Sequence, residues 1–265
     1  MSEQTQDWYW QQLKSEAARY REQEPALAGF YNTCILDHET LAEALGHHLA
    51  SKLASKAVPA DELSMVFQDV LKAEPSILRK ACEDLQAYVD RDPACDEYCM
   101  PFLYFKGFQA LQSYRIAHGL WQQQRQQLAL FLQNAISMHF DVDIHPAAKI
   151  GSGVMIDHAT GVVIGETAVI GNNVSLLHSV TLGGSGCSHG DRHPKVSDGV
   201  LVSTGAKLLG NIKVGQGAKI AAGSLVLNNV AAHTTVAGVP ARVVGRPAED
   251  QPALDMNQQF TENSS

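Results

Sequence analysis

Residues 144–183 read IHPAAKIGSGVMIDHATGVVIGETAVIGNNVSLLHSVTLG, and this stretch decides the fold of the second half of the chain. Aliphatic residues recur in it every six positions, with a slip of two residues at Val162-Val163. The recurring positions are Ile144, Ile150, Ile156, Ile164, Ile170, Leu176 and Leu182, and the register resumes at Val202, Leu208, Val214, Ile220 and Val226.

A helix cannot use this period, because residues six apart point in different directions around its axis. A short strand that ends in a sharp corner can use it, with the aliphatic side chain pointing inward and Gly or Asn at the turn. Three such units make one triangular coil, and stacked coils would pair as parallel strands about 4.8 Å apart. The pattern therefore predicts a parallel β-helix built from hexapeptide repeats.

The rest of the chain has a different composition. Of its 21 glycines, 17 follow residue 140, whereas 17 of the 18 Phe, Trp and Tyr residues lie at or before it. Apolar residues before 140 recur at three- and four-residue steps, which is typical of helices. We therefore expect an α+β chain with an all-α domain over residues 1–140, a β-helix over 141–246 with a protruding loop at 183–199, and a flexible tail over 247–265.

Bulk properties exclude several classes of protein. The net charge of −8 argues against nucleic-acid binding. The chain has no run of about 18 apolar residues, so no membrane partner is expected, and its first residues do not resemble a secretory signal. Five scattered cysteines fit reduced thiols, so we expect a cytoplasmic protein.

Two interruptions of the repeat carry the candidate site. The first lies beside Asp157-His158, and the second is the polar stretch that contains Arg192 and His193. His158 and His178 lie one coil apart and should stack. A neutral imidazole could take a proton from an alcohol with a carboxylate such as Asp143 nearby, while a second carboxylate and an arginine could hold an amino acid.

The second half of the chain offers two candidate ligand sites, one for a metal ion and one for a cofactor. Cys187, His189 and His193 are close in sequence, but with no obvious fourth ligand we predict no metal site. Basic residues instead concentrate after the second interruption, which suggests a groove for the phosphates of a coenzyme A. The residues predicted to bind this cofactor are Gly184, Thr204, Gly205, Lys219, Ala222, Gly223 and Arg242.

Several strings together resemble the serine O-acetyltransferase family. They are DIHPAAKIGSGVMIDHATGVVIGETAVIG, SVTLGG, GDRHPK, GAKLLGNIKVGQGAKIAAGS and AGVPAR, with RDPA at 91–94 and FLYFKGFQALQSYRIAH at 102–118. The resemblance covers residues from about 5 to about 250, and DHATG with GDRHPK makes it specific.

The resemblance implies acetyl transfer from acetyl-CoA to the hydroxyl of L-serine, as the first step of cysteine synthesis, on a left-handed β-helix. It implies His158 as the general base and Asp143 as the carboxylate that orients it. Asp157, Arg192 and His193 would hold serine, with Asp92 reaching in from the helical domain. It also implies a site between neighbouring β-helices of a homotrimer, helical domains that pair trimers, and inhibition by L-cysteine at the serine site.

The chain also departs from the family. Members that bind cysteine synthase end in isoleucine, whereas this sequence ends in Thr261–Ser265, so we do not expect that complex. The nearest alternative is a hexapeptide acetyltransferase with another acceptor. A γ-type carbonic anhydrase, which needs zinc, and a non-catalytic docking module are the remaining alternatives.

Overall fold

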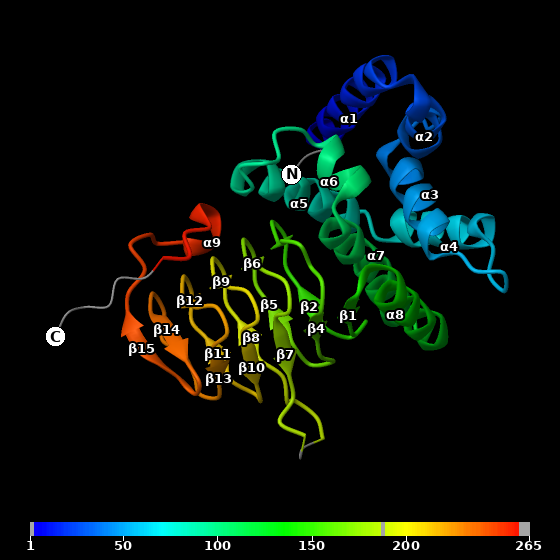
Figure 1. The fold of residues 1–265 in the computed structure, drawn as a ribbon. Coiled ribbons are helices and arrows are strands. Elements are labelled where there is room, and N and C mark those ends of the chain that lie inside the picture. The colour runs from blue at the N-terminus through cyan, green and yellow to red at the C-terminus, as the bar shows by residue number, and fades with distance from the viewer. Residues whose placement is uncertain (1–2, 187–188, 260–265) are drawn as a thin grey trace.

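The computed structural model describes residues 3–186 and 189–259, and Figure 1 shows a helical region stacked against one end of a β-helix. The helical region also contains a short 3₁₀ turn at Pro25–Leu27 and a π-helical turn at Asn32–Leu36. Its helices are α1 (Glu3–Gln23), α2 (Ala28–Tyr31), α3 (Leu41–Leu53), α4 (Ala60–Ala73), α5 (Ser76–Arg91), α6 (Cys99–Tyr104), α7 (Lys106–Gln122) and α8 (Gln126–Phe140).

After α8 the chain winds through short strands. They are β1 (Val142–Ile144), β2 (Lys149–Ile150), β3 (Met155–Ile156), β4 (Val162–Ile164), β5 (Val169–Ile170), β6 (Ser175–Leu176), β7 (Thr181–Gly183), β8 (Lys195–Val196), β9 (Leu201–Val202), β10 (Lys207–Leu209), β11 (Lys213–Val214), β12 (Lys219–Ile220), β13 (Leu225–Val226), β14 (Thr235–Gly238) and β15 (Ala241–Gly245). A short helix, α9 (Pro252–Asp255), follows.

The strands form three sheets, one for each side of a triangular coil. We name them by their first strands: the β1 sheet (β1-β4-β7-β10-β13), the β2 sheet (β2-β5-β8-β11) and the β3 sheet (β3-β6-β9-β12-β14-β15). Every pairing is parallel except that of the final hairpin, β14–β15. In the β1 sheet the register aligns Ile144, Ile164, Leu182, Leu208 and Val226. The predicted β-helix and its interior ladder are confirmed.

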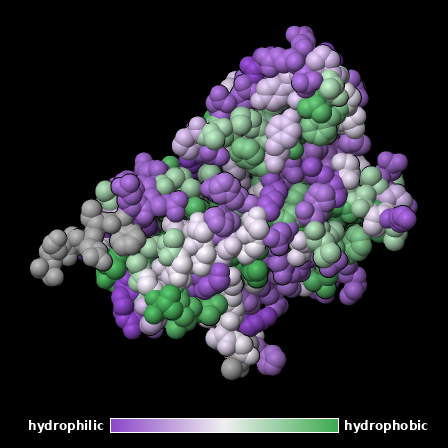
Figure 2. Space-filling model, in the orientation of Figure 1, coloured by the Kyte–Doolittle hydropathy of each residue, from purple (hydrophilic) through white to green (hydrophobic). Residues whose placement is uncertain are grey.

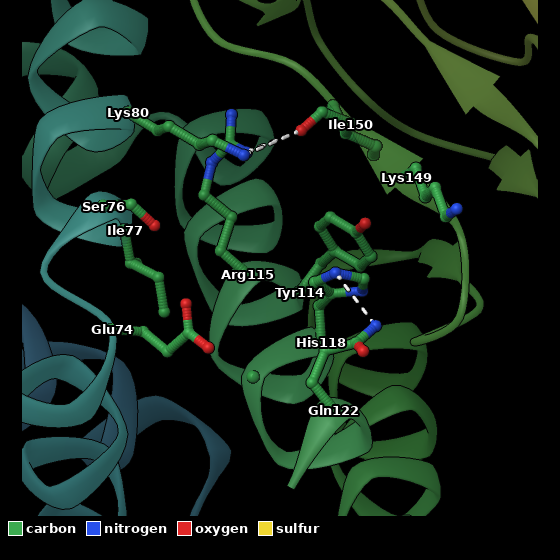
Figure 3. Close-up of a pocket in the computed structure, with 11 residues that line it drawn as sticks. Glu74, Ser76, Ile77, Lys80, Tyr114, Arg115, His118, Gln122, Lys149 and Ile150 are labelled. Carbon is green, nitrogen blue, oxygen red and sulfur yellow. Dashed lines mark hydrogen bonds between the residues drawn. The ribbon is translucent and has the colours of Figure 1, made fainter.

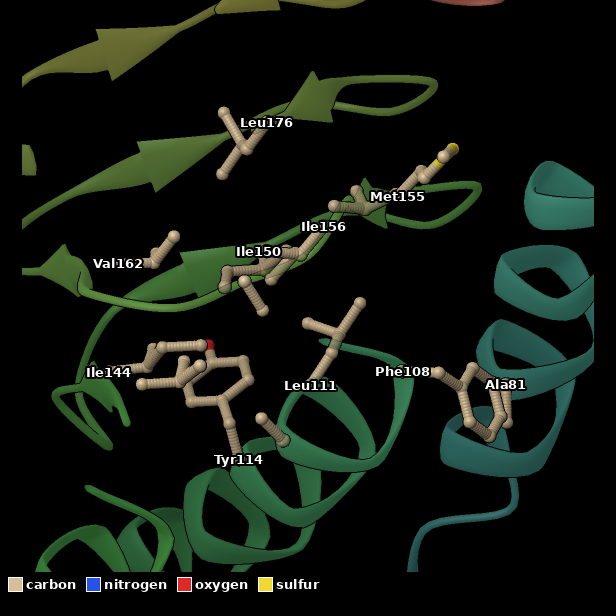
Figure 4. Close-up of a cluster of buried hydrophobic side chains, with 14 of the residues drawn as sticks. Ala81, Phe108, Leu111, Tyr114, Ile144, Ile150, Met155, Ile156, Val162 and Leu176 are labelled. Atoms are coloured by element: carbon tan, nitrogen blue, oxygen red, sulfur yellow. The ribbon is translucent and has the colours of Figure 1, made fainter. Parts of the chain in front are cut away.

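Helix α7 closes the open end of the β-helix. Its Leu111 and Tyr114 point toward the interior ladder beside Ile144, Ile150 and Ile156 (Figure 4). This packing fills the junction with large side chains (Figure 4), whereas the aligned inward positions of the β1 sheet are aliphatic.

A buried ion pair joins the same two regions. The Arg115 guanidinium lies 2.7 Å from the Asp84 carboxylate and also donates to the carbonyls of Ile150 and Gly151. The other Asp84 oxygen accepts a hydrogen bond from the backbone N–H of Val154. Because both charges are buried and bonded to the β-helix backbone, removing either one would leave the other unpaired at a cost of about 3–5 kcal/mol.

The loop and the tail differ from the expectation. The coil resumes at Val196, which aligns with Ile170 and Val214, so β8 falls inside the stretch expected to be a loop. The tail is not uniformly flexible, because α9 buries Ala253 and its carbonyl accepts a hydrogen bond from Ser175. Val196 fits the six-residue period as the position before Val202, whereas the contact of Ala253 with Ser175 spans 78 residues and no periodicity could reveal it.

The surface adds two observations. Within the part of the chain that the structure describes, no helix is long and apolar enough to cross a membrane. Figure 2 shows hydrophobic surface at the far end of the β-helix, where the exposed valines Val239 and Val243 lie on or beside the β14–β15 hairpin.

Candidate active site

Three of the predicted site residues surround one pocket. Asp92, Asp157 and His158 line a cavity of about 380 Å³ between the helical region and the coil, together with Tyr104 and Lys106. Asp92 ends α5 in an extended conformation, as expected for a residue before proline, and one of its oxygens accepts the N–H of Ala94. The expected reach of Asp92 from the helices to the Asp157-His158 turn is therefore present within one chain.

The turn that carries His158 is shaped by the helical region. We call residues 157–161, between the β3 and β1 sheets, the His158 corner. His158 and Ala159 both adopt left-handed backbone angles, with φ of 55° and 60°. Such angles are strained for side chains of L-residues, so they need external support.

Tyr88 and Gly107 supply that support. The buried Tyr88 hydroxyl donates to the carbonyl of Ile156 at 2.9 Å and accepts its N–H at 3.2 Å. A Cβ at Gly107 would overlap the same carbonyl. Neither residue was among the predicted site residues. A glycine in the first turn of a helix was the available signal, because glycine is costly there unless a close approach requires it.

Charges around the His158 corner come from both regions. The His158 Nε2 lies 3.7 Å from the Asp157 carboxylate. Burial raises the pKa of Asp157, the nearby His158 lowers it, and Asp92 raises it further. His158 and His178 are neighbours on successive coils, as predicted. Their rings meet edge to face, with centroids 5.7 Å apart.

Asp143 lies on the outer face of β1, where its side chain accepts a hydrogen bond from Gln133 at 2.7 Å. Its charge acts on His145, whose pKa is lowered mainly by burial and raised in part by Glu166 and Asp143. The carboxylate paired with His158 in the described chain is Asp157. The orienting role expected of Asp143 stays a prediction, and α8, which holds Asp143 through Gln133, was not foreseen as its partner.

Arg192 and His193 form a second cluster. We call residues 165–168 and 189–194, between the β1 and β2 sheets, the His193 corner. The Arg192 guanidinium forms an ion pair with Glu166 at 2.6 Å. This pairing lowers the pKa of Glu166, although burial opposes the shift.

Thr167 holds this cluster in place through hydrogen bonds. Its hydroxyl oxygen accepts the backbone N–H groups of Arg192 and His193 at 3.0 and 3.1 Å, and lies 2.9 Å from the His193 Nδ1. A Cβ at Gly165 would overlap the His193 ring. Sequence reasoning missed both Gly165 and Thr167, because their partners lie 25 or more residues later in the chain.

The two corners are separate within one chain. The β1 sheet lies between them, and the charges acting on Asp157 come from His158, Asp92 and His178. Burial lowers the pKa of His193. The charges that act on this residue are those of Arg192, Glu166, Lys195 and His145. A ligand that needs both corners therefore cannot be enclosed by a single β-helix.

A row of small residues follows the His158 corner along the coil, at the place where the sequence predicts a cofactor groove. Gly205 and Gly223 have left-handed φ angles of 71° and 68°, and a Cβ at Gly223 would meet nothing within 4 Å. The Gly223 N–H bonds to the carbonyl of Thr204, so the two Thr/Ala-Gly pairs stack one coil apart as expected. The open backbone beside Gly223 and Ala222 could admit a long, thin ligand.

The remaining cofactor candidates differ in their surroundings. Gly184 lies at the base of the second interruption. A Cβ at this position would lie 3.5 Å from the side chains of Arg192 and His193. Arg242 is exposed on β15. Lys219 is only 2% exposed, and its ammonium donates to the carbonyl of Gln259 in the tail. In this conformation the tail covers Lys219, so this lysine does not face a cofactor.

Among the described residues, no group of three or more His, Cys, Asp and Glu side chains is arranged to hold a metal ion. Cys187, one of the three residues considered for such a site, lies outside the described residues, and so do residues 260–265 at the end of the tail.

The hexapeptide coils, the His–carboxylate pocket at one corner and the adjacent row of small residues define a β-helical acyltransferase. Comparison with known proteins narrows this class. Residues 9–113 match the family model described as "Serine acetyltransferase, N-terminal". The serine acetyltransferase of Escherichia coli (strain K12) is 57% identical over 251 residues, which are 95% of this chain and 92% of that protein.

Solved structures agree with this result. The serine acetyltransferase of Vibrio cholerae superposes with a TM-score of 0.94 at 55% identity, covering 95% of this chain and 98% of that one. A serine acetyltransferase in complex with cysteine gives 0.94 at 54% (97% and 100% covered), and that of Brucella abortus with coenzyme A gives 0.88 at 50% (89% and 95% covered). The chain belongs to the serine acetyltransferase family, which confirms the sequence-based prediction of this enzyme.

Proposed function

We propose that the enzyme transfers the acetyl group of acetyl-CoA directly to the hydroxyl of L-serine, giving O-acetyl-L-serine and CoA without an acyl-enzyme intermediate. The observation that carries the proposal is the pocket in which Asp92, Asp157 and His158 converge. Two carboxylates suit the ammonium group of an amino acid, and the imidazole beside them suits its hydroxyl.

In this mechanism His158 is the general base. Its imidazole takes the proton of the serine hydroxyl as the oxygen attacks the thioester carbonyl. The tetrahedral intermediate then collapses, the C–S bond breaks, and the imidazolium returns the proton to the leaving thiolate of CoA. A carboxylate stabilises the imidazolium, and Asp157 and Asp143 are the two candidates for that role.

The acceptor's carboxylate group needs Arg192 and His193, which lie at the other corner. We propose that a neighbouring copy supplies them, so that each site forms between two β-helices of a homotrimer. Val163, on the outer face of the β1 sheet, is 38% exposed, and Leu227, which follows β13 at the far edge of that sheet, is 47% exposed. Packing between the β1 sheets of neighbouring copies would cover both side chains and bring the corners of adjacent copies together. The helical region could then pair two trimers.

We place the cofactor along the row formed by Thr204, Gly205, Ala222 and Gly223, with Arg242 near its far end. L-cysteine has the ammonium and carboxylate of serine and would compete for the same two corners. Since its thiol replaces the hydroxyl, we expect it to act as an inhibitor.

The release of CoA thiol from acetyl-CoA tests the reaction. Wild type should turn over with L-serine and far less with sugars or other amines. His158→Ala should lower kcat/KM by about 10³–10⁴-fold if His158 is the principal base. The single variants Asp143→Asn and Asp157→Asn are compared side by side. The carboxylate that orients His158 is the one whose loss lowers kcat more. A loss of only about 10²-fold for His158→Ala would argue against its role as the principal base.

A further inference from the structure

A second cavity lies at the joint between the two regions, outside the site described above. It measures about 280 Å³, which is near the lower end for ligand pockets. The start of α5, the second half of α7 and strand β2 enclose it (Figure 3), and it shares no lining residue with the His158 pocket. Its charged and polar side chains are those of Glu74, Ser76, Lys80, Tyr114, Arg115, His118, Gln122 and Lys149.

Positive charge in this cavity is incompletely matched. The Arg115 guanidinium is paired with Asp84, but within the described residues Lys80 has no carboxylate in ion-pair range. The hydrogen bond of the Lys80 ammonium is a long one, 3.4 Å to the carbonyl of Ile150, which Arg115 also uses at 3.2 Å. Burial, and then the charge of Arg115, lowers the pKa of Lys80, although the charges of Asp84 and Glu74 oppose the shift. A half-buried ammonium with unused donors is poorly solvated and favours an anionic partner.

The cavity also carries one negative group. Figure 3 shows the Glu74 side chain directed into the space between α5 and α7, apart from the Lys80 ammonium, while Lys149 lies across the cavity on β2 with its ammonium directed away from Lys80. Burial lowers the pKa of His118, although its hydrogen bond to the carbonyl of Pro146 opposes the shift. Cationic and anionic groups at separate positions in one cavity match a ligand that bears both charges.

We propose that this cavity binds a free amino acid, with its carboxylate on Lys80 and its ammonium on Glu74. Lys80 supplies donors that the protein leaves unused, and Glu74 favours a zwitterion over a simple carboxylate. The bound molecule would lie beside the Ile150 carbonyl, where Arg115 joins the helices to the first coil. This site is independent of the acetyl-transfer chemistry and of how copies assemble.

Labelling of Lys80 tests the proposal in the full-length enzyme. The protein is treated briefly with acetic anhydride, and acylation of each lysine is read by peptide mass spectrometry. L-alanine is the probe because its side chain is only a methyl group, and acetate is the carboxylate-only comparison. The amine of free alanine consumes part of the anhydride, so the labelling of Lys80 is measured relative to that of the exposed Lys56 on the α3–α4 loop. At three times its Kd, alanine should lower this ratio by about fourfold.

Glu74→Gln provides the matched variant, since it removes one charge with little change in shape. It should abolish the advantage of alanine over acetate while leaving weak protection by acetate. A labelling ratio that is the same with and without alanine would overturn the proposal. The proposal would also be overturned by equal protection from acetate in wild type, or by a Glu74→Gln variant that keeps the preference for alanine.

Discussion

The His158 corner and the His193 corner occupy the same β-helix but are held in place by different parts of the chain. Tyr88 and Gly107, both in the helical region, fix the backbone of Ile156 just before Asp157 and His158. The His193 corner depends on the coil itself, because Thr167 binds the backbone of the returning loop. The base therefore depends on the docking of the helices, whereas the proposed carboxylate-binding groups depend on the insertion in the repeat.

The largest effect should come from breaking the His158 corner at Gly107. In Gly107→Ala the new methyl group overlaps the Ile156 carbonyl, so either α7 or the turn must move. Overpacking of this kind costs about 1–3 kcal/mol of stability. We expect kcat to fall at least about 100-fold, because a small misplacement of a catalytic group has effects of that size. Steady-state kinetics and thermal unfolding measure both consequences.

Gly29→Ala is the matched control, because a Cβ there would meet nothing within 4 Å. It should behave as wild type in both measurements. A Gly107→Ala enzyme with normal kcat would show that the helices do not position the base.

Breaking the other corner should give a different kinetic signature. In Gly165→Ala the added methyl overlaps the His193 ring and displaces it. If His193 holds the acceptor's carboxylate, KM for serine should rise about tenfold or more, corresponding to the loss of about one charge-assisted hydrogen bond, with a smaller change in kcat. The KM for acetyl-CoA is the internal control. A fall in kcat with an unchanged serine KM would contradict the assignment.

The smallest effect expected is a shift in pH dependence. Burial and the neighbouring Asp92 raise the pKa of Asp157. The ionised carboxylate that binds ammonium is therefore present above this raised pKa and lost as the pH falls through it. Asp92→Asn removes a negative neighbour, which lowers the pKa of Asp157 and should move the acidic limb of kcat/KM for serine to lower pH. Asp96→Asn, at an exposed position nearby, should leave the limb in place.

The coil was predictable because its signal is local and repeated. Six-residue spacing determined the interior ladder, and counting coils was enough to stack His158 on His178. The re-entry of the chain at Val196 escaped the same reasoning. Val196 lies six residues before Val202 and so fits the period, but a single aliphatic residue at the end of a polar, glycine-rich stretch does not by itself indicate a coil.

The site was predictable only in part, because its support comes from distant segments. Asp92, Asp157 and His158 converge as expected, yet Tyr88 contacts Ile156 across 68 residues of sequence. No spacing rule links them. Likewise, the burial of Lys219 by the tail depends on how α9 packs, so its positive charge alone suggested a cofactor contact that this conformation does not offer.

The central claim is that one catalytic site combines the His158 corner of one copy with the His193 corner of another. Co-assembly of two inactive variants, His158→Ala and Arg192→Ala, tests it most directly. In randomly mixed trimers each mixed assembly contains one site with both corners intact, so activity should return to about a quarter of the wild-type value. A mixture that stays as inactive as its two components, with mixed trimers shown to be present, would contradict the shared site.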